Sequence, residues 1–253
     1  MSAIKQQINL MLIALTFLTR VPSPIEINFS QHNLNKASRY FSLIGYFVGV
    51  TTALIFWLCS QVLPTDIAII ISMILSFLLT GGFHEDGLAD TCDGLGGGFE
   101  RHQKLTIMKD SRIGTYGALG IWSILSFKFV LLSNLENVVL ALVVAHPLSR
   151  SVSTVLIALL PYVQDAADSK SKPLAESQLG KDWMIALLIG LTSLMLLPNL
   201  WFFVVPTLVG FVFLARQFLK KQIGGFTGDA LGAVQQVAEV LVYLVIIIGS
   251  QAL

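Results

Sequence analysis

Charged residues are scarce in this sequence. Asp, Glu, Lys and Arg make up 12% of its 253 residues, against about 25% in a typical soluble domain. Hydrophobic residues make up 55%, and the mean hydropathy is +0.76. This composition excludes an ordinary soluble domain and predicts an integral membrane protein. A formal net charge of only +1 also argues against a nucleic-acid partner.

Cysteine is rare as well. Cys59 lies in an apolar run and Cys92 in an acidic stretch, so the sequence has neither a disulfide framework nor a C-x-x-C zinc pattern. A cleavage signal is also missing: the apolar run at 8–18 is not followed by a small-residue site of the A-x-A kind. We expect the N-terminal segment to be retained, lying at the membrane interface or inserted obliquely, because it is short for a span.

Long apolar runs dominate the rest of the chain. A spanning helix needs about 20 mostly apolar residues, and five runs meet this length: 40–62, 66–83, 115–133, 137–160 and 230–250. Two shorter runs, 183–197 and 200–215, are separated by Pro198 and Asn199 and form a tight hairpin or one kinked element. We predict a single all-α membrane domain over residues 1–253, a polytopic bundle of about seven transmembrane helices plus the short N-terminal helix.

The basic residues alternate between the two sides of this bundle. The connections 20–39, 84–114, 161–182 and 216–229 hold thirteen of the sixteen Lys and Arg residues, and the intervening connections hold none. By the positive-inside rule, the long polar connections face the cytoplasm and the C-terminus faces the other side. Lys128 and Arg150 fall inside spans. We expect Lys128 to extend its amine to the interface, whereas Arg150 needs a buried partner.

The stretch GGFHEDGLADTCDGLGGGFE, residues 81–100, places four acids within nine residues: Glu85, Asp86, Asp90 and Asp93. If the preceding helix continues through it, Asp86, Asp90 and Asp93 share one helical stripe. Carboxylates so close repel one another unless a cation lies among them. Mg²⁺ suits such a site, because it takes one or two carboxylates together with waters and substrate phosphates. We therefore predict that these three aspartates bind Mg²⁺.

Glycine surrounds these acids. Seven glycines in the stretch let backbone approach a ligand closely and expose amides that can hold phosphate oxygens: Gly81, Gly82, Gly87, Gly94, Gly96, Gly97 and Gly98. The alternative is a solvated loop that is acidic by chance. His84 is open to two interpretations, as a proton acceptor or metal ligand, or as a residue that makes hydrogen bonds at a helix end.

Basic residues follow the acids. We interpret Arg101 and Lys104 as topological charges, and Arg112, in DSRIGTYG, as a phosphate ligand. Further along, His146 and Arg150 lie one turn apart in an apolar span, with the acidic stripe as the expected partner of Arg150.

The last apolar run carries a polar face. Asp229, Gly232, Gln236, Glu239 and Tyr243 recur at spacings of three and four. Helix packing in lipid would explain the glycine and the glutamine, but it does not explain a carboxylate at each end. We expect this face to point into the bundle, toward the acidic stretch.

Four motifs carry a family resemblance. GGFHEDGLADTCDG, RIGTYG, PLSR and GFTGDALGAVQQVAE, in this order, closely resemble the cobalamin synthase family, adenosylcobinamide-GDP ribazoletransferase, nearly end to end. The resemblance implies a multi-pass enzyme of the bacterial inner membrane that depends on Mg²⁺. It would join adenosylcobinamide-GDP to α-ribazole or its 5′-phosphate and release GMP. A homo-oligomer, or a complex with other late cobamide-pathway enzymes, is a further expectation.

The motif residues fall into three expected roles. Asp86, Asp90 and Asp93 are the metal ligands, and one of His84, Glu85 or Asp229 is the catalytic base. The residues expected to bind substrate or phosphate are Arg112, His146, Arg150, Thr227, Gln236 and Glu239. Two rival interpretations are a CDP-alcohol phosphotransferase, against which Phe83 stands where that pattern has its first Asp, and a membrane transporter, for which no paired half-sequences are present.

Overall fold

The computed structural model describes residues 3–163 and 181–252. Helices make up nearly all of this part of the chain, and its one β contact is an isolated bridge between Tyr162 and Phe226. The helices are α1 (Ala3–Leu18), α2 (Gln31–Ala37), η1 (Ser38–Tyr40), α3 (Phe41–Ser60), α4 (Thr65–Thr80), α5 (Phe83–Gly97), α6 (Arg101–Met108), α7 (Thr115–Ser133), α8 (Val138–Leu159), α9 (Asp182–Leu191), η2 (Thr192–Leu196), α10 (Trp201–Ile223) and α11 (Gly228–Ala252). The predicted all-α polytopic architecture is confirmed.

The predicted spans differ from the helices mainly in length. In the described residues, five helices are long and apolar enough to cross a membrane, and six if α4 and α5 count as one broken span. The run expected at 200–215 is a full-length helix, α10, whereas the run at 183–197 forms the shorter α9 and η2. Pro198 and Asn199 separate the two, so the hairpin alternative is the correct one. The expectation of about seven spans therefore exceeds what length and composition support by themselves.

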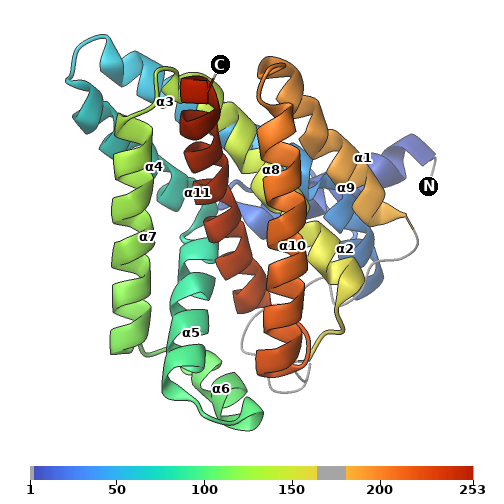
Figure 1. Cartoon of the computed structure of the whole chain (residues 1–253). Helices are drawn as coiled ribbons and strands as arrows, with labels where there is room; N and C mark the ends of the chain where they lie inside the picture. Colours follow the sequence, from blue (N-terminus) through green and yellow to red (C-terminus); the bar gives the residue numbers. More distant parts are fainter. Residues whose placement is uncertain (1–2, 164–180, 253) are drawn as a thin grey trace.

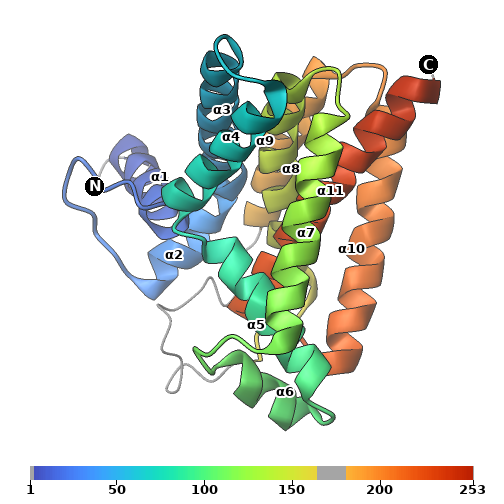
Figure 2. The same ribbon diagram turned by 90° about the vertical axis from the view of Figure 1, so that its left-hand side faces the viewer.

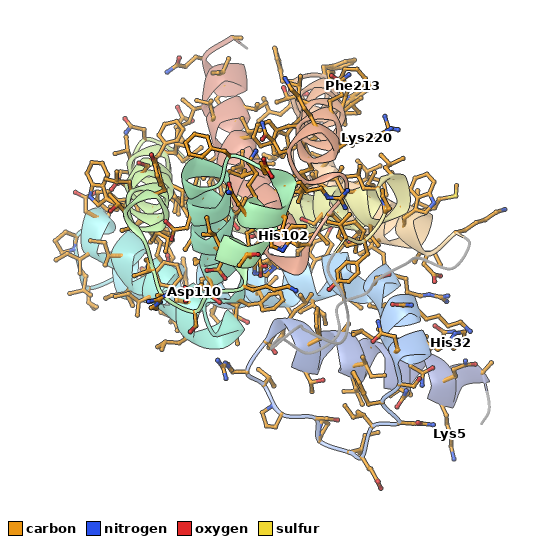
Figure 3. The ribbon with its side chains drawn as sticks, turned by 90° about the horizontal axis from the view of Figure 1, so that it is seen from below. Lys5, His32, His102, Asp110, Phe213 and Lys220 are labelled. Carbon is orange, nitrogen blue, oxygen red and sulfur yellow. The ribbon has the colours of Figure 1, made fainter. Side chains whose placement is uncertain are left out.

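The connections lie at two ends of the bundle (Figure 1). The turns at 61–64, 134–137 and 197–200 and the C-terminus lie at one end, and α6 and the C-terminal end of α10 lie at the other. The first end has no Lys or Arg in these turns, as expected from the charge pattern. Figure 3 views the opposite end, where His102, Asp110 and Lys220 are labelled. Most of the basic connection at 161–182 falls outside the described residues.

Two helices form the centre of the bundle. Most of α8 and α11 is buried, whereas α7 and α10 expose most of their apolar side chains to the surroundings. Small residues allow α3 to approach α8 closely, because a Cβ at Gly45 would lie 2.6 Å from the Cα of Pro147. Polar side chains of α8 and α11 consequently lie inside the protein and away from lipid.

A sharp bend separates α4 from α5. Gly81 and Gly82 adopt positive φ angles of 71° and 66°, a conformation that glycine allows at little cost. The two helices meet at 88°. The acidic stretch is therefore a separate helix, and the expectation of one helix continuing through the paired glycines is wrong.

The N-terminal helix packs on the flank of the bundle (Figure 2). Leu10, Ile13 and Ala14 of α1 are buried against a second apolar cluster that includes Leu34 of α2 and Val48 of α3. At the C-terminal end of α1, the amide of Arg20 donates to the carbonyl of Leu79 at 2.7 Å. This contact fixes the end of α1 beside the bend between α4 and α5.

Candidate active site

The helix α5 separates its acids onto different faces. Asp86 is exposed and Asp90 is half-buried, whereas Glu85 and Asp93 are buried. Glu85 points to α11, where its Oε1 accepts a hydrogen bond of 3.0 Å from Nε2 of Gln236. The helical spacing of Asp86, Asp90 and Asp93 is as predicted, but the environments of the three carboxylates differ.

Glycines bring α5 against the start of α11. A Cβ at Gly87 would lie 2.9 Å from the carbonyl oxygen of Asp229, and one at Gly232 would lie 3.2 Å from the carbonyl oxygen of His84. Both distances are tighter than ordinary packing allows. Gly87 therefore serves the crossing of two helices, and not the cradling of phosphate that the sequence suggested. The crossing places Asp229 on the same side of the molecule as Asp86.

A polar pocket of about 510 Å³ opens at this crossing. It lies between the end of α1, the bend between α4 and α5, and the start of α11. Its lining residues are Thr16, Phe17, Thr19, Arg20, Val21, Pro22, Thr80, Gly81, Phe83, Asp86, Gly228 and Asp229. The pocket thus joins acids from both acidic motifs to an arginine from the N-terminal segment.

The negative charges around this pocket act on one another. Asp90 experiences the charges of Asp229, Asp86, Asp93 and Asp110, and Asp229 that of Asp86. Repulsion of this kind favours a bound cation. Within the described residues, however, no three His, Cys, Asp or Glu side chains lie close enough to hold a metal ion together. The set fits an ion such as Mg²⁺, which needs only one or two carboxylates when substrate phosphates supply other ligands.

Asp93 has a clear structural function. Its Oδ2 accepts a hydrogen bond of 2.7 Å from the amide of Gly114, and its Oδ1 accepts one of 2.8 Å from the amide of Gly117. These amides belong to the beginning of α7, where a carboxylate also offsets the positive end of the helix dipole. Both oxygens of Asp93 thus hold α7 against α5. These contacts give Asp93 a structural role, and metal binding by Asp93 stays a prediction.

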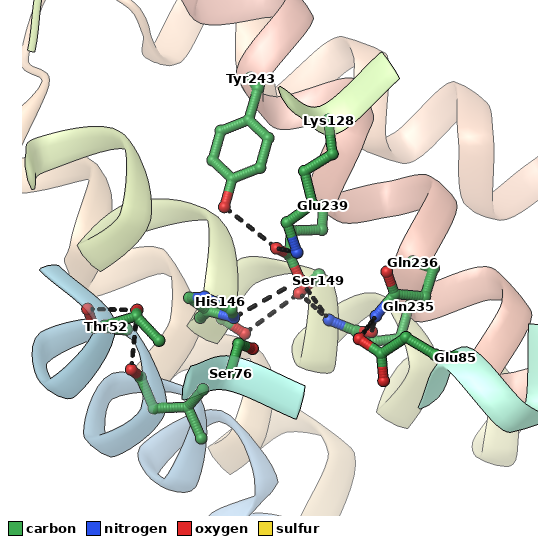
Figure 4. A network of polar contacts seen from close by, with 12 residues as sticks. Thr52, Ser76, Glu85, Lys128, His146, Ser149, Gln235, Gln236, Glu239 and Tyr243 are labelled. Carbon is green, nitrogen blue, oxygen red and sulfur yellow. Dashed lines mark hydrogen bonds and ion pairs between the residues drawn. The ribbon is translucent and has the colours of Figure 1, made fainter. Parts of the chain in front are cut away.

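A second polar cluster lies inside the bundle and centres on Glu239 (Figure 4). Its Oε1 forms an ion pair with Nζ of Lys128 and accepts a hydrogen bond of 3.0 Å from the hydroxyl of Tyr243. Its Oε2 lies 3.4 Å from Nδ1 of His146. The expectation that Lys128 extends to the interface is wrong, because its side chain is 2% exposed and reaches this carboxylate. A charge inside the bundle is stabilised only by such a partner.

Two glutamines connect Glu239 to α5. Nε2 of Gln235 donates to Oε2 of Glu239 at 2.8 Å and lies 2.9 Å from Oγ of Ser149. Nε2 of Gln236 donates to Oε1 of Gln235 at 2.9 Å and to Glu85. The polar face of the last helix therefore points into the bundle, as predicted. Its far half contacts α7 and α8, and only its first turns contact the acidic helix.

Arg150 lies deep beside this cluster. It is 3% exposed, and its NH1 donates to the carbonyl oxygen of His146 at 3.0 Å. The carboxylates that act most on its charge are Glu239 and Glu85. The aspartate stripe is therefore not its partner, contrary to expectation. His146 and Arg150 do not line the large polar pocket, so substrate contact by these two residues stays a prediction.

Two other predicted substrate ligands make local contacts. Nε and NH2 of Arg112 donate to the carboxylate of Asp110 at 3.1 and 2.6 Å, and its side chain is 87% exposed. This hydrogen bond raises the pKa of Arg112. The hydroxyl oxygen of Thr227 accepts from the amide of Ala230 at 3.1 Å, which caps the start of α11. Phosphate binding by Arg112 and substrate binding by Thr227 stay predictions.

Lys104, which we interpreted as a charge that sets the membrane orientation, contacts another helix. Its Nζ donates to Oε1 of Gln222 at 2.6 Å, which joins α6 to the end of α10. Other glycines of the stretch also serve packing, since a Cβ at Gly94 would lie 2.8 Å from the carbonyl oxygen of Lys104. The glycines at 94 and 87 thus explain how helices α6 and α11 fit against α5.

The sequence interpretation missed three residues that the structure places at these sites. Lys128 was assigned to the interface, Gln235 was overlooked beside its neighbour, and Arg20 was counted only among the topological charges. The signal for Lys128 was present, because a lysine in the middle of a span needs an acidic partner. No sequence pattern predicted that the end of α1 would reach the bend between α4 and α5.

Comparison with known proteins identifies the family. Residues 10–247 match the model of a family described as cobalamin-5-phosphate synthase. The chain is 46% identical to an adenosylcobinamide-GDP ribazoletransferase of Shewanella amazonensis, over 98% of each chain. It is 47% identical to one of Shewanella frigidimarina, over 96% of this chain and 95% of the relative. It is 43% identical to one of Vibrio cholerae, again over 96% of this chain and 95% of the relative.

No solved structure matches the chain. The family match covers both acidic motifs, the polar pocket and the buried cluster around Glu239. It agrees with the resemblance carried by the four sequence motifs. The chain belongs to the cobalamin-5-phosphate synthase family.

Proposed function

We propose that the protein transfers the corrinoid phosphate of adenosylcobinamide-GDP to α-ribazole, or to its 5′-phosphate, and releases GMP. The observation that carries this proposal is the set of near-full-length relatives that bear this enzyme name. The polar pocket supports it, because a guanidinium that can bind phosphate oxygens and carboxylates that can hold a cation in one pocket suit a substrate with a charged diphosphate.

In the proposed reaction, a hydroxyl oxygen of the acceptor attacks the phosphorus that carries the corrinoid. A new P–O bond forms while the bond from this phosphorus to the bridging oxygen breaks. The bridging oxygen leaves with GMP, and the hydroxyl proton passes to a base on the protein. Catalysis then depends on the positioning of the two substrates and on stabilisation of the charge on the phosphate oxygens.

Asp229 is the proposed base. It lines the polar pocket beside Asp86, whereas the other two candidates are buried away from it. Glu85 is held by Gln236 inside the bundle, and His84 is 5% exposed. A base must come within hydrogen-bond reach of the hydroxyl that it deprotonates. Of the three candidates, Asp229 is the one whose side chain already lines the pocket.

The acids of α5 are the proposed ligands of Mg²⁺. Asp86 and Asp90 would hold the ion at the edge of the pocket, and Asp93 would keep α5 and α7 in register. When bound, Mg²⁺ draws negative charge from the diphosphate. The two carboxylates would hold the ion beside the diphosphate, and the exposed side of Asp86 leaves space for the substrate oxygens.

The proposed location is the bacterial inner membrane. The end of the bundle that carries α6 and the last turn of α10, with Lys220 and Lys221, would face the cytoplasm. The donor is large and its diphosphate is charged, so a pocket reached from the cytoplasmic side suits it.

The test is a reconstitution with both substrates. Purified protein in detergent is incubated with adenosylcobinamide-GDP, with and without α-ribazole, and GMP is measured. We expect GMP only when both substrates and Mg²⁺ are present, and α-ribazole 5′-phosphate is tested in parallel. GMP release without an acceptor would indicate a hydrolase. The family match argues against a lipid phosphotransferase and against a transporter. Ion flux in vesicles without GMP release would instead support the transporter interpretation.

A further inference from the structure

Arg20 brings a positive charge from the N-terminal segment to the acidic pocket. It follows α1, and its main-chain amide is fixed to the carbonyl of Leu79 at the end of α4. Among the described residues that line the pocket, Arg20 is the one Lys or Arg, and Asp86 and Asp229 are the acids. A ligand in this pocket therefore lies between two carboxylates and one guanidinium.

The Arg20 side chain occupies the space beside Gly81, where any other residue would place its Cβ. A Cβ at Gly81 would collide with the Nε and the guanidinium carbon of Arg20. Gly81 also has a φ of 71°, a conformation that an L residue rarely adopts. The bend thus serves two purposes: it turns α5 away from α4, and it leaves space for a guanidinium at the pocket.

The other hydrogen-bond donors of the pocket wall are already used. The hydroxyl groups of Thr16, Thr19 and Thr80 donate to helix carbonyls at 3.0, 2.7 and 2.9 Å. In the described part of the chain, the guanidinium of Arg20 has no carboxylate within ion-pair distance. It can therefore offer several N–H donors to a ligand, in the planar geometry that matches phosphate oxygens.

The start of α5 also lines the pocket. Phe83 lines the pocket as the first residue of a helix of 15 residues, and Gly82 before it supplies no capping side chain. The beginning of a helix carries a partial positive charge and unpaired amides, which favour an anion. Asp86 belongs to the same first turn, so the pocket places donors for an anionic group, from Arg20 and the start of α5, beside a carboxylate.

We propose that Arg20 binds a phosphate oxygen of the diphosphate in the donor substrate and positions it against the carboxylates of α5 and α11. This inference rests on the proposed function, since it assigns the residue that recognises the donor. The N-terminal segment then forms one wall of the substrate site in addition to packing on the flank of the bundle. The phosphate of a lipid headgroup has the same chemistry, and the experiment separates the two sources.

The main test compares donor and acceptor kinetics in Arg20→Gln. We expect KM for adenosylcobinamide-GDP to rise about 10- to 100-fold, the range for loss of a charge-assisted hydrogen bond, while KM for α-ribazole stays within about twofold. Arg20→Lys should be intermediate, because an ammonium keeps the charge without the bidentate geometry. Lys220→Gln, which removes an exposed charge on α10 outside the pocket, should behave as wild type.

A binding measurement gives a readout that does not depend on turnover. Equilibrium dialysis of adenosylcobinamide-GDP with detergent-solubilised protein, without acceptor, should show a weaker Kd in Arg20→Gln by the same factor. Thermal stability is then measured with and without added phosphatidylglycerol. An unchanged donor Kd, together with loss of the phosphatidylglycerol-dependent stabilisation, would assign Arg20 to a lipid headgroup and overturn the proposal.

The outcomes separate this inference from the proposed function. Wild-type protein without GMP release would contradict the function itself. Active wild type with an unchanged KM and Kd in Arg20→Gln would contradict only the role of Arg20. If Arg20→Gln fails to give a single folded species on gel filtration, the donor Kd is measured in Arg20→Lys instead. A Kd equal to that of wild type in this variant overturns the proposal.

Discussion

Lys128 of α7 and Glu239 of α11 form an ion pair inside the bundle, with side chains that are 2% and 1% exposed. Both helices are candidate membrane spans, and both residues are buried within the protein. Tyr243 and Gln235 donate to the same carboxylate. The pair therefore links α7 to α11, whose first residues line the polar pocket.

Removing one partner of this pair should destabilise the protein strongly. In Glu239→Gln, the ammonium of Lys128 stays buried without its counter-charge, which costs about 3–5 kcal/mol of folding free energy. Adding Lys128→Met should recover much of the loss, because no buried charge then lacks a partner. Thermal unfolding in detergent measures both. Arg150→Gln is the matched control, and recovery of Glu239→Gln by this change instead would show that Arg150 is the real partner.

Asp86→Asn and Asp90→Asn should each lower turnover by about 100-fold or more, because loss of a metal ligand exceeds the 10- to 100-fold cost of losing its supporting groups. Folding should be unaffected, since Asp86 is exposed and Asp90 is half-buried. Asp66→Asn, at the exposed first turn of α4, is the control of equal charge change. GMP release at limiting Mg²⁺ is the assay. Near-normal turnover of either variant would remove that residue from the metal site.

Asp93→Asn should lower the stability of the contact between α5 and α7. An amide group can accept from one of the two amides that Asp93 now binds, so the other loses its partner, at about 1–3 kcal/mol. Hydrogen exchange at Gly114 and Gly117 should become faster, with exchange in α8 unchanged. The loss of stability should be the same with and without Mg²⁺. Unchanged exchange combined with a lower affinity for Mg²⁺ would return Asp93 to the metal ligands.

The sequence predicted the bundle better than the site. Runs of about 20 apolar residues identify spans because the thickness of the bilayer sets their length. The runs at 183–197 and 200–215 lacked this length. The first agrees with α9 and η2 within one residue, whereas the second ended too early, because α10 continues to Ile223. The break at Gly81 and Gly82 depends on two positive φ angles, which paired glycines permit but do not require.

The site depended on contacts between distant segments. Spacing along α5 placed Asp86, Asp90 and Asp93 on one stripe. It could not show that Asp93 accepts hydrogen bonds from amides at the start of α7. Likewise, a lysine at 128 predicts a buried acid somewhere, and only the packing of α7 beside α11 shows that this acid is Glu239. Side-chain pairs of this kind depend on how the helices pack, which local periodicity does not encode.

The charge pattern also predicts the orientation in the membrane. A reporter fused after Gly224, at the end of α10, should read cytoplasmic, and one fused after Ala252 should read periplasmic. The reason is that α11 crosses the membrane once between these positions. Paired alkaline phosphatase and fluorescent protein fusions give the readout. A cytoplasmic reading at both positions would mean that α11 does not cross.

The crossing of α5 and α11 leads to the last prediction, which concerns Gly87. A Cβ there would lie 2.9 Å from the carbonyl oxygen and 3.0 Å from the Cα of Asp229. Backbone atoms cannot rotate away as a side chain can, so Gly87→Ala must move the two helices apart by a few tenths of an ångström. Asp229 would then shift relative to Asp86, and a misplacement of about 1 Å can cost about 100-fold in rate.

We expect Gly87→Ala to reduce turnover about 10-fold or more, with a smaller effect on thermal stability, because alanine favours the helix by roughly 0.5–1 kcal/mol. Gly210→Ala in α10 is the matched control, since no atom lies within 4 Å of its Cβ position. It should keep the wild-type rate and gain slightly in stability. Wild-type turnover in Gly87→Ala would show that catalysis does not need the close approach of Asp229 to α5.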